Sequence, residues 1–258
     1  MKTMLNVNIV NWYKRKAASA VYRHKVALNL AVPLISFTFD DFPESALRIG
    51  GEVLKSHGLS GTYYVSLGLL GKDAPAGRLC TSEDVVAAAK SGHELGCHTY
   101  SHCNSWDTDS NVYEQSVIQN QAALGKIVPG LTFRSFSYPL ATPSPWVKRV
   151  CARHFVSCRS GSQTFNAKRV DLNQLSSYFL EKANGNLDPI KDIIQQNNRS
   201  KGWLIFATHD VAPSPSPYGC TPEFFKEVVQ YAIDSGSRIM PVAEAVDVIR
   251  GVDFSQVA

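Results

Sequence analysis

Residues 34–58 decide the fold: LISFTFDD (34–41) is followed by SALRIGGEVLKSHG (45–58). The first part is a short apolar run rich in residues that favour strands, and the second has the length and composition of a helix. Because the first run is almost continuously apolar, it is typical of a strand buried on both faces of a parallel sheet. The pair therefore predicts one strand–helix unit of an α/β protein.

The same unit recurs along the chain. GTYYVSLG (61–68) precedes TSEDVVAAAKSG (81–92), and HELGCHT (93–99) precedes NVYEQSVIQNQAALGKI (111–127). Further apolar runs bring the predicted strands to about eight: FRSFSYP (133–139), HFVSCRSG (154–161), LNQLSSYFL (172–180), WLIFATHD (203–210) and SRIMPV (237–242). This alternation is expected either for a doubly wound sheet or for a (β/α) barrel, and periodicity alone does not separate the two.

Capping residues support the predicted helix boundaries. Thr81 or Ser82 can cap the helix that begins there, and Gly92 stands where that helix should stop. The sequence TPE (221–223) has the arrangement of a cap followed by proline in the first turn. These signals place helices between the predicted strands.

Composition limits the class of protein. The chain has 258 residues, 44% of them hydrophobic and 19% charged, which excludes a disordered protein and suits one large domain. A net charge of +4 is too small for a nucleic-acid-binding surface, so we expect no nucleic-acid partner. The six cysteines form no C-x-x-C pair and are expected to be free thiols.

The N-terminus differs from the rest of the chain. Residues 1–28 mix basic residues and asparagines and lack the continuous apolar segment of a signal peptide. We therefore divide the chain into a basic N-terminal extension (1–28) and one large domain (29–258), and we expect a cytoplasmic protein. The extension is either a helix packed on the domain or a weak, peripheral contact with a membrane surface.

Ionisable residues follow several predicted strands. Asp40 and Asp41 end the first, His98 and His102 follow the third, and His209 ends the strand at 203–208. In α/β folds the carboxyl ends of parallel strands share one edge, where sites are built. Adjacent aspartates at the end of a buried strand are costly unless they are paired or bind a metal. Two histidines and a carboxylate are a recognised open metal site.

Four stretches carry a family resemblance: TFDDFP (38–43), GHELGCHTYSH (92–102), SFSYPLA (135–141) and WLIFATHD (203–210). In this order and spacing they resemble the polysaccharide deacetylases of carbohydrate esterase family four, which share a homology domain with nodulation-factor chitooligosaccharide deacetylases. The resemblance covers about residues 30–250. It implies a single-domain, distorted (β/α) barrel with seven to eight mostly parallel strands.

The resemblance also implies roles for individual residues. Asp40 matches the family's general base, and Asp41, His98 and His102 match its metal ligands. His209 matches the histidine that acts as general acid. The implied cofactor is a divalent metal, for which Zn²⁺ fits two imidazoles and a carboxylate and Co²⁺ and Ni²⁺ follow on ligand type.

The chain departs from the family pattern in the third motif. Ser137 stands where relatives usually carry an arginine, and Arg134 is about 10 Å away along an extended strand. Arg159 is the nearest candidate to orient Asp40. The expected substrate-contacting or orienting residues are Tyr138, Pro139, Leu140, Arg159 and Trp203.

The resemblance implies a hydrolase that removes N-acetyl groups from oligo- or polysaccharides containing N-acetylhexosamine. Two alternatives stay open. In the first, the protein uses the same metal site as an O-acetyl sugar esterase or as a hydrolase of small cyclic amides. In the second, it binds carbohydrate in the groove of this fold and has no catalytic activity. In each of the saccharide cases the partner is a carbohydrate.

Overall fold

One curved parallel sheet organises the molecule. The computed structural model describes residue 13 and residues 16–251. Within that part, seven strands are hydrogen-bonded in the following order: β10 (Tyr178–Phe179), β11 (Trp203–Thr208), β2 (Leu34–Phe39), β3 (Thr62–Val65), β6 (Glu94–Cys97), β7 (Ser135–Ser137) and β8 (Ser157–Arg159). An eighth strand, β12 (Arg238–Ile239), pairs with β2, and all these pairings are parallel.

The ends of this sheet are brought together by the segment before β10. Cys158 N donates to Leu172 O (2.7 Å) and Leu175 N donates to Cys158 O (2.8 Å), after which the chain continues into β10 beside β11. The segment thus links β8 to the opposite end of the strand order. The predicted distorted (β/α) barrel is confirmed, and the doubly wound sheet is excluded.

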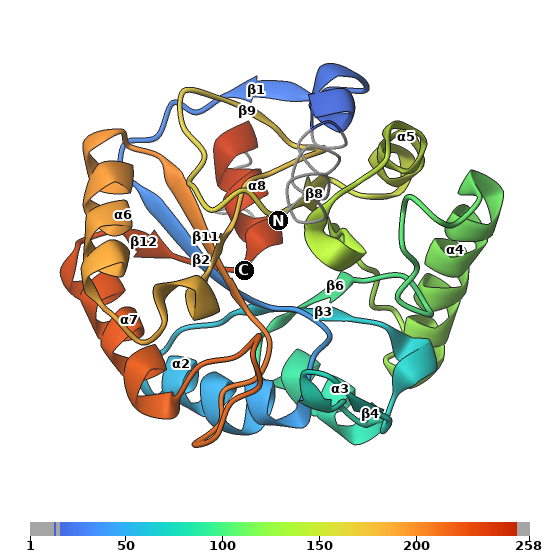
Figure 1. Cartoon of the computed structure of the whole chain (residues 1–258), viewed down its shortest axis with the longest axis horizontal. Coiled ribbons are helices and arrows are strands. Elements are labelled where there is room, and N and C mark those ends of the chain that lie inside the picture. Colours follow the sequence, from blue (N-terminus) through green and yellow to red (C-terminus); the bar gives the residue numbers. More distant parts are fainter. Residues whose placement is uncertain (1–12, 14–15, 252–258) are drawn as a thin grey trace, which may run out of the picture.

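Helices surround the barrel (Figure 1). They are η1 (Ala46–Gly51), α2 (Glu52–Ser56), α3 (Ser82–Lys90), α4 (Ser110–Ile127), α5 (Pro145–His154), α6 (Asp188–Arg199), α7 (Pro222–Asp234) and α8 (Val242–Arg250). The predicted caps are present, because Thr81 forms a capping box with Asp84 and Thr221 accepts from Phe224 N. Short elements complete the fold: β1 (Lys25–Ala27), η2 (Leu67–Leu69), β4 (Asp73–Ala74), β5 (Gly77–Arg78), η3 (Pro139–Ala141), β9 (Arg169–Asp171) and η4 (Leu180–Ala183).

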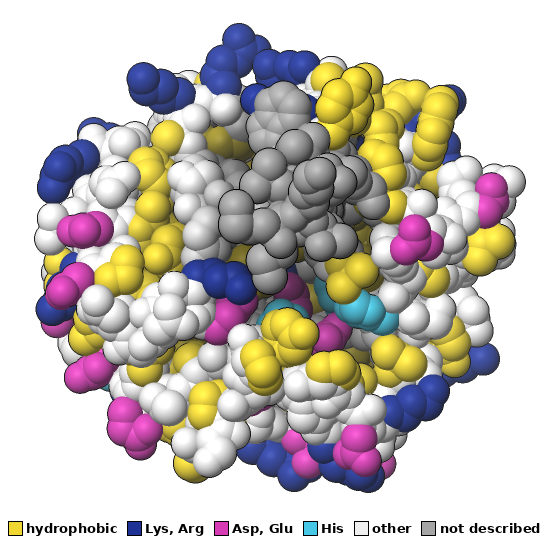
Figure 2. Space-filling view, in the orientation of Figure 1, with side chains coloured by type: hydrophobic (Ala, Val, Ile, Leu, Met, Phe, Trp, Pro, Cys, Tyr) yellow, Lys and Arg dark blue, Asp and Glu magenta, His cyan; other side chains and the backbone are white. Residues whose placement is uncertain are grey.

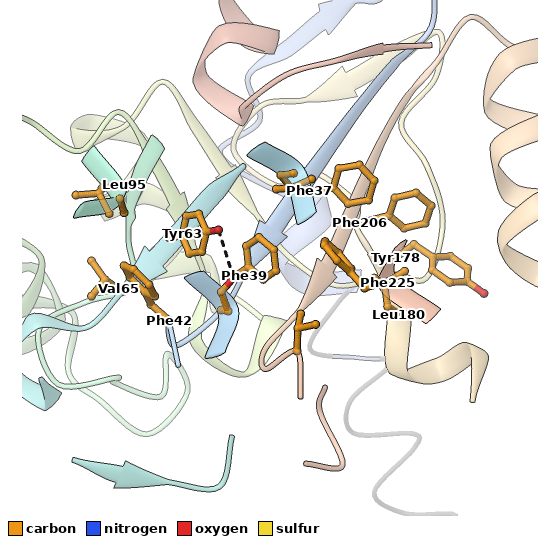
Figure 3. Packing of buried hydrophobic residues seen from close by; sticks show 14 of the residues in the cluster. Phe37, Phe39, Phe42, Tyr63, Val65, Leu95, Tyr178, Leu180, Phe206 and Phe225 are labelled. Atoms are coloured by element: carbon orange, nitrogen blue, oxygen red, sulfur yellow. Dashed lines mark hydrogen bonds between the residues drawn. The ribbon is translucent and has the colours of Figure 1, made fainter. Parts of the chain in front are cut away.

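The side chains of β2 alternate between two buried environments on the two faces of the strand. Phe37 and Phe39 both pack against Phe225 of α7, at ring-centroid distances of 5.6 and 5.7 Å (Figure 3). Ser36 and Thr38, on the other face, bond to β11. Because neighbouring residues of a strand face opposite sides, Asp40 continues the polar row that starts at Ser36.

A second apolar cluster lies under the amino ends of the strands. It joins Leu34, Trp203 and residues of α8, and Trp203 is completely buried, its indole N–H donating to Ser36 Oγ (3.0 Å). The expectation that Trp203 contacts a substrate is wrong, because it begins β11 and so lies at the end of the barrel opposite His209.

The N-terminal segment is joined to the barrel. β1 pairs with β9 in antiparallel fashion. The buried Lys148 ammonium of α5 donates to Ala18 O (3.0 Å) and to the Asp171 carboxylate (2.6 Å). Residues 1–12, 14 and 15 of the predicted extension lie outside the described residues. No helix among the described residues has the length and hydrophobicity needed to cross a bilayer.

We predict that Trp203 stabilises the fold and does not affect substrate affinity. Trp203→Phe keeps most of the packing but leaves Ser36 without its indole donor, so the free energy of unfolding should fall by about 1–3 kcal/mol. Urea denaturation measures this loss. KM should equal that of the wild type, and a rise in KM at unchanged stability would contradict the structural assignment.

Candidate active site

The ionisable residues singled out by the sequence meet at one end of the barrel. Asp40 and Asp41 directly follow β2, His98 directly follows β6, and His209 directly follows β11. Since these strands are parallel and in register, their carboxyl ends open on the same edge. Figure 2 shows histidine and acidic side chains gathered near the middle of this face.

Asp41, His98 and His102 form a compact three-residue group. Asp41 Oδ1 lies 3.4 Å from His98 Nε2 and 3.3 Å from His102 Nε2, and all three ligand atoms lie within 4.8 Å of one another. Ligands bound to one tetrahedral ion at about 2.0–2.1 Å are separated by about 3.3–3.4 Å. The group therefore has the dimensions of a divalent metal site.

The protonation state of His98 also suits a metal ligand. Its Nδ1 lies 2.8 Å from Ser137 O, and because a carbonyl only accepts, Nδ1 carries the proton. Burial lowers the pKa of His98 to about 4, so the imidazole is neutral at pH 7. Its Nε2 lone pair then faces Asp41 and is free to bind a cation.

Left-handed backbone conformations place these ligands. Asp41 (φ 60°), Thr99 (φ 60°) and His102 (φ 54°) all have positive φ, which costs energy for residues other than glycine. Thr99 Oγ1 accepts from Cys103 N (2.9 Å) and stabilises the turn between the two histidines. Because the backbone turns at Asp41, the Asp41 carboxylate does not point where the next side chain of an extended strand would. Asp40 still follows the alternation of β2.

Asp40 is held apart from this group by Arg159. The Arg159 guanidinium donates to Asp40 Oδ1, to Ser137 Oγ (2.6 Å) and to Ser177 Oγ (2.9 Å), and both charged side chains are buried. Burial alone would raise the pKa of Asp40, but the positive charge of Arg159 and its hydrogen bond to the carboxylate lower this pKa to about 2. Asp40 is therefore ionised at neutral pH.

Aromatic rings enclose the guanidinium. Cζ of Arg159 lies 5.1 Å from the centroid of the Tyr64 ring and 5.6 Å from the centroid of the Phe179 ring. At these distances a cation is attracted to the face of an aromatic ring. Arg159 thus makes the contact with Asp40 that we expected. Arg134 does not, because it bonds to Asp247 on α8 at the other end of the barrel (2.6 and 2.8 Å).

His209 is oriented by a backbone carbonyl. Its Nδ1 lies 3.2 Å from Tyr218 O, so this nitrogen carries the proton and Nε2 is left for other contacts. The adjacent Asp210 is not its partner, because that carboxylate accepts from Ser216 N (2.8 Å) and Ser216 Oγ (2.5 Å).

Glu181 supplies the acidic group that sequence analysis missed. Tyr178 and Phe179 of β10 pair with Phe206 and Ala207 of β11, so η4, which holds Glu181, follows β10 at the same end of the barrel where His209 follows β11. Burial raises the pKa of Glu181 and the charge of His209 lowers it, and its Oε2 is a buried atom without a hydrogen-bond partner among the described residues. Only the strand register reveals this neighbour, since the two residues are far apart in sequence.

The remaining predicted residues have different environments. Tyr138 is buried and its hydroxyl donates to Asn173 O (3.0 Å), so its ring cannot stack on a sugar. Pro139 is buried, whereas Leu140 is 64% exposed and has a positive φ of 59°. Cys97 is buried and its sulfur accepts from Asn120 (3.3 Å), which fits a packing role.

Comparisons with known proteins agree with this geometry. The family model for polysaccharide deacetylases matches residues 28–154, which include Asp40, Asp41, His98 and His102. A search of curated proteins finds no match.

Several solved structures share the fold. They include a family 4 acetyl xylan esterase from Clostridium thermocellum in complex with a cobalt ion (21% identity, 85% of this chain and 93% of that chain, TM-score 0.59). Another is the Bc1960 peptidoglycan N-acetylglucosamine deacetylase (20% identity, 85% and 90%, TM-score 0.60). A third is a CE4 family pseudoenzyme from Bacillus anthracis (12% identity, 88% and 68%, TM-score 0.58). Residues 28–154 thus match the polysaccharide deacetylase family, and the chain as a whole has the fold of the carbohydrate esterase family 4 structures.

Proposed function

We propose that the protein is a metal-dependent hydrolase that removes N-acetyl groups from saccharides containing N-acetylhexosamine. The observation that carries the proposal is the separation of two adjacent carboxylates: Asp41 joins two histidines, while Asp40 is ionised and held by Arg159. The resemblance to a peptidoglycan N-acetylglucosamine deacetylase supports the choice of an amide substrate.

Asp41, His98 and His102 would hold the metal ion. When bound, a divalent cation polarises the substrate carbonyl and lowers the pKa of a water molecule toward neutrality. Two imidazoles and one carboxylate suit Zn²⁺, and Co²⁺ and Ni²⁺ accept the same ligand types. The cobalt ion in the related esterase agrees with such a ligand set.

Asp40 would act as the general base. Asp40 is ionised and precedes Asp41 in sequence, but it is not one of the three proposed metal ligands. Its carboxylate can therefore accept a proton from the attacking water. Arg159 fixes its orientation and keeps its charge stable in a buried position. The main-chain N–H of Leu140, in the turn that follows β7, would donate to the developing oxyanion.

His209 would act as the general acid. An amide nitrogen is a poor leaving group, so its departure needs a proton donor on that side of the substrate. Glu181, in η4 just after the neighbouring strand β10, is the acidic group whose pKa the charge of His209 lowers, so it is placed to interact with this imidazole.

The second candidate is an O-acetyl sugar esterase with the same site. The related acetyl xylan esterase favours it. An alkoxide leaves more readily than an amine anion, so ester hydrolysis depends less on His209 than amide hydrolysis does.

Asp40→Asn tests the proposal directly. Loss of the general base should lower kcat for acetate release from chitooligosaccharides by about 100- to 10,000-fold while KM and metal content stay unchanged. Asp73→Asn, at an exposed carboxylate (85% exposed), is the matched control and should keep full activity. A wild-type protein that binds metal and oligosaccharide but releases no acetate from amides or esters would favour the non-catalytic alternative.

His209→Gln separates the two candidate substrates. The variant should lose about 100- to 10,000-fold in kcat on N-acetyl substrates and clearly less on p-nitrophenyl acetate. Wild-type kcat/KM on acetylated xylan above that on chitooligosaccharides would instead assign the protein as an esterase. Circular dichroism verifies that the variant is folded.

The neutral state of His98 predicts how stability depends on pH in the metal-free protein. Because its pKa is about 4 in the folded state and 6.5 unperturbed, the unfolded chain binds a proton there first as the pH falls. The free energy of unfolding should therefore decrease between pH 6.5 and 4 by up to about 1.4 kcal/mol per pH unit from this residue. Urea denaturation with EDTA measures the slope, and His98→Asn should reduce it. An identical slope in both proteins would contradict a buried, neutral imidazole.

A further inference from the structure

One side of the molecule combines an unusual charge pattern with exposed apolar rings. The first 39 residues contain six lysines and arginines and no aspartate or glutamate. Helix α5, PWVKRVCARH, contains no acidic residue either. Two segments distant in sequence thus lack the negative charges that usually alternate with positive ones on a protein surface.

The structure joins these two segments into one surface. Lys148 of α5 is buried and donates to Ala18 O (3.0 Å), which attaches the N-terminal helical turn to α5. Arg149, one residue on, lies over the Tyr22 ring at 5.7 Å. The nearby acid, Asp171, is neutralised by Lys148 (2.6 Å) and is largely covered, with 15% of its side chain exposed.

The surface exposes apolar side chains between its basic ones. Trp146 is 62% exposed, Tyr22 38% and Val21 37%. We define the basic aromatic face as Val21, Tyr22, Arg23, Lys25, Trp146 and Arg149, all of which are exposed. Figure 2 shows basic and hydrophobic side chains along the upper edge of this view and the acidic ones elsewhere.

We propose that the basic aromatic face binds the surface of an anionic membrane. Lysine and arginine are attracted to acidic headgroups, while tryptophan and tyrosine favour the boundary between headgroups and acyl chains. The apolar side chains project from α5 and from the bend at residues 21–22 and are exposed to solvent, so they suit insertion into lipid. The proposal is independent of the catalytic one, because it uses none of the proposed catalytic residues.

The test is co-sedimentation of the full chain with vesicles at low salt. The wild type should bind vesicles of phosphatidylcholine with 30% phosphatidylglycerol and should not bind phosphatidylcholine alone. The triple variant Arg23→Glu, Lys25→Glu, Arg149→Glu should reduce the partition coefficient at least roughly tenfold. The matched control makes the same change in net charge at exposed lysines of other helices: Lys90→Glu, Lys126→Glu and Lys226→Glu. This control should bind the vesicles much better than the first triple variant.

Trp146→Ala tests the apolar contribution without a change in charge. It should weaken vesicle binding several-fold, and the blue shift of tryptophan fluorescence on adding vesicles should decrease. Equal losses in the two triple variants, or no preference of the wild type for anionic vesicles, would overturn the proposal. Alginate, a soluble polyanion, is the comparison ligand. The proposal would also be overturned if the protein bound alginate as strongly as vesicles and Trp146→Ala left both kinds of binding unchanged. Circular dichroism shows that each variant is folded.

Discussion

The burial of a negative charge at Asp40 is the constraint around which the upper part of the barrel is arranged. A carboxylate removed from water without compensation would be protonated or would destabilise the fold. Arg159 supplies the compensation from β8, and two serines from neighbouring segments satisfy other guanidinium donors. The Tyr64 and Phe179 rings then enclose the planar group, so the base and its partner form one rigid unit inside the barrel.

Two consecutive aspartates can serve different purposes because the backbone changes conformation between them. Asp40 still follows the alternation of β2 and faces the barrel interior. Asp41 has a left-handed conformation, and its carboxylate lies beside the two histidines instead. Such a conformation costs energy, and the surrounding structure must provide it. One buried strand end therefore presents both a free carboxylate and a metal ligand.

The guanidinium that compensates Asp40 comes from β8 and not from the third motif, which begins on β7. Ser137 stands where the sequence resemblance led us to expect an arginine, and the guanidinium that reaches Asp40 belongs to Arg159 on β8, which lies beside β7 in the sheet. Ser137 Oγ accepts from that guanidinium, so the small residue leaves room for Arg159 and bonds to it. In this chain the positive charge beside Asp40 therefore comes from β8.

The sequence by itself determined the strand–helix alternation, the caps at Thr81 and Thr221, and the residues that form the metal-sized group. These features depend on local composition or on short spacing, such as the three residues between His98 and His102. The position of Glu181 near His209 and the burial of Trp203 were decided only by the tertiary structure, which also provided the hydrogen bonds by which Arg159, a candidate from the sequence, orients Asp40. Each depends on which strands are neighbours and on their register, and register is set by packing between segments that the linear order does not relate.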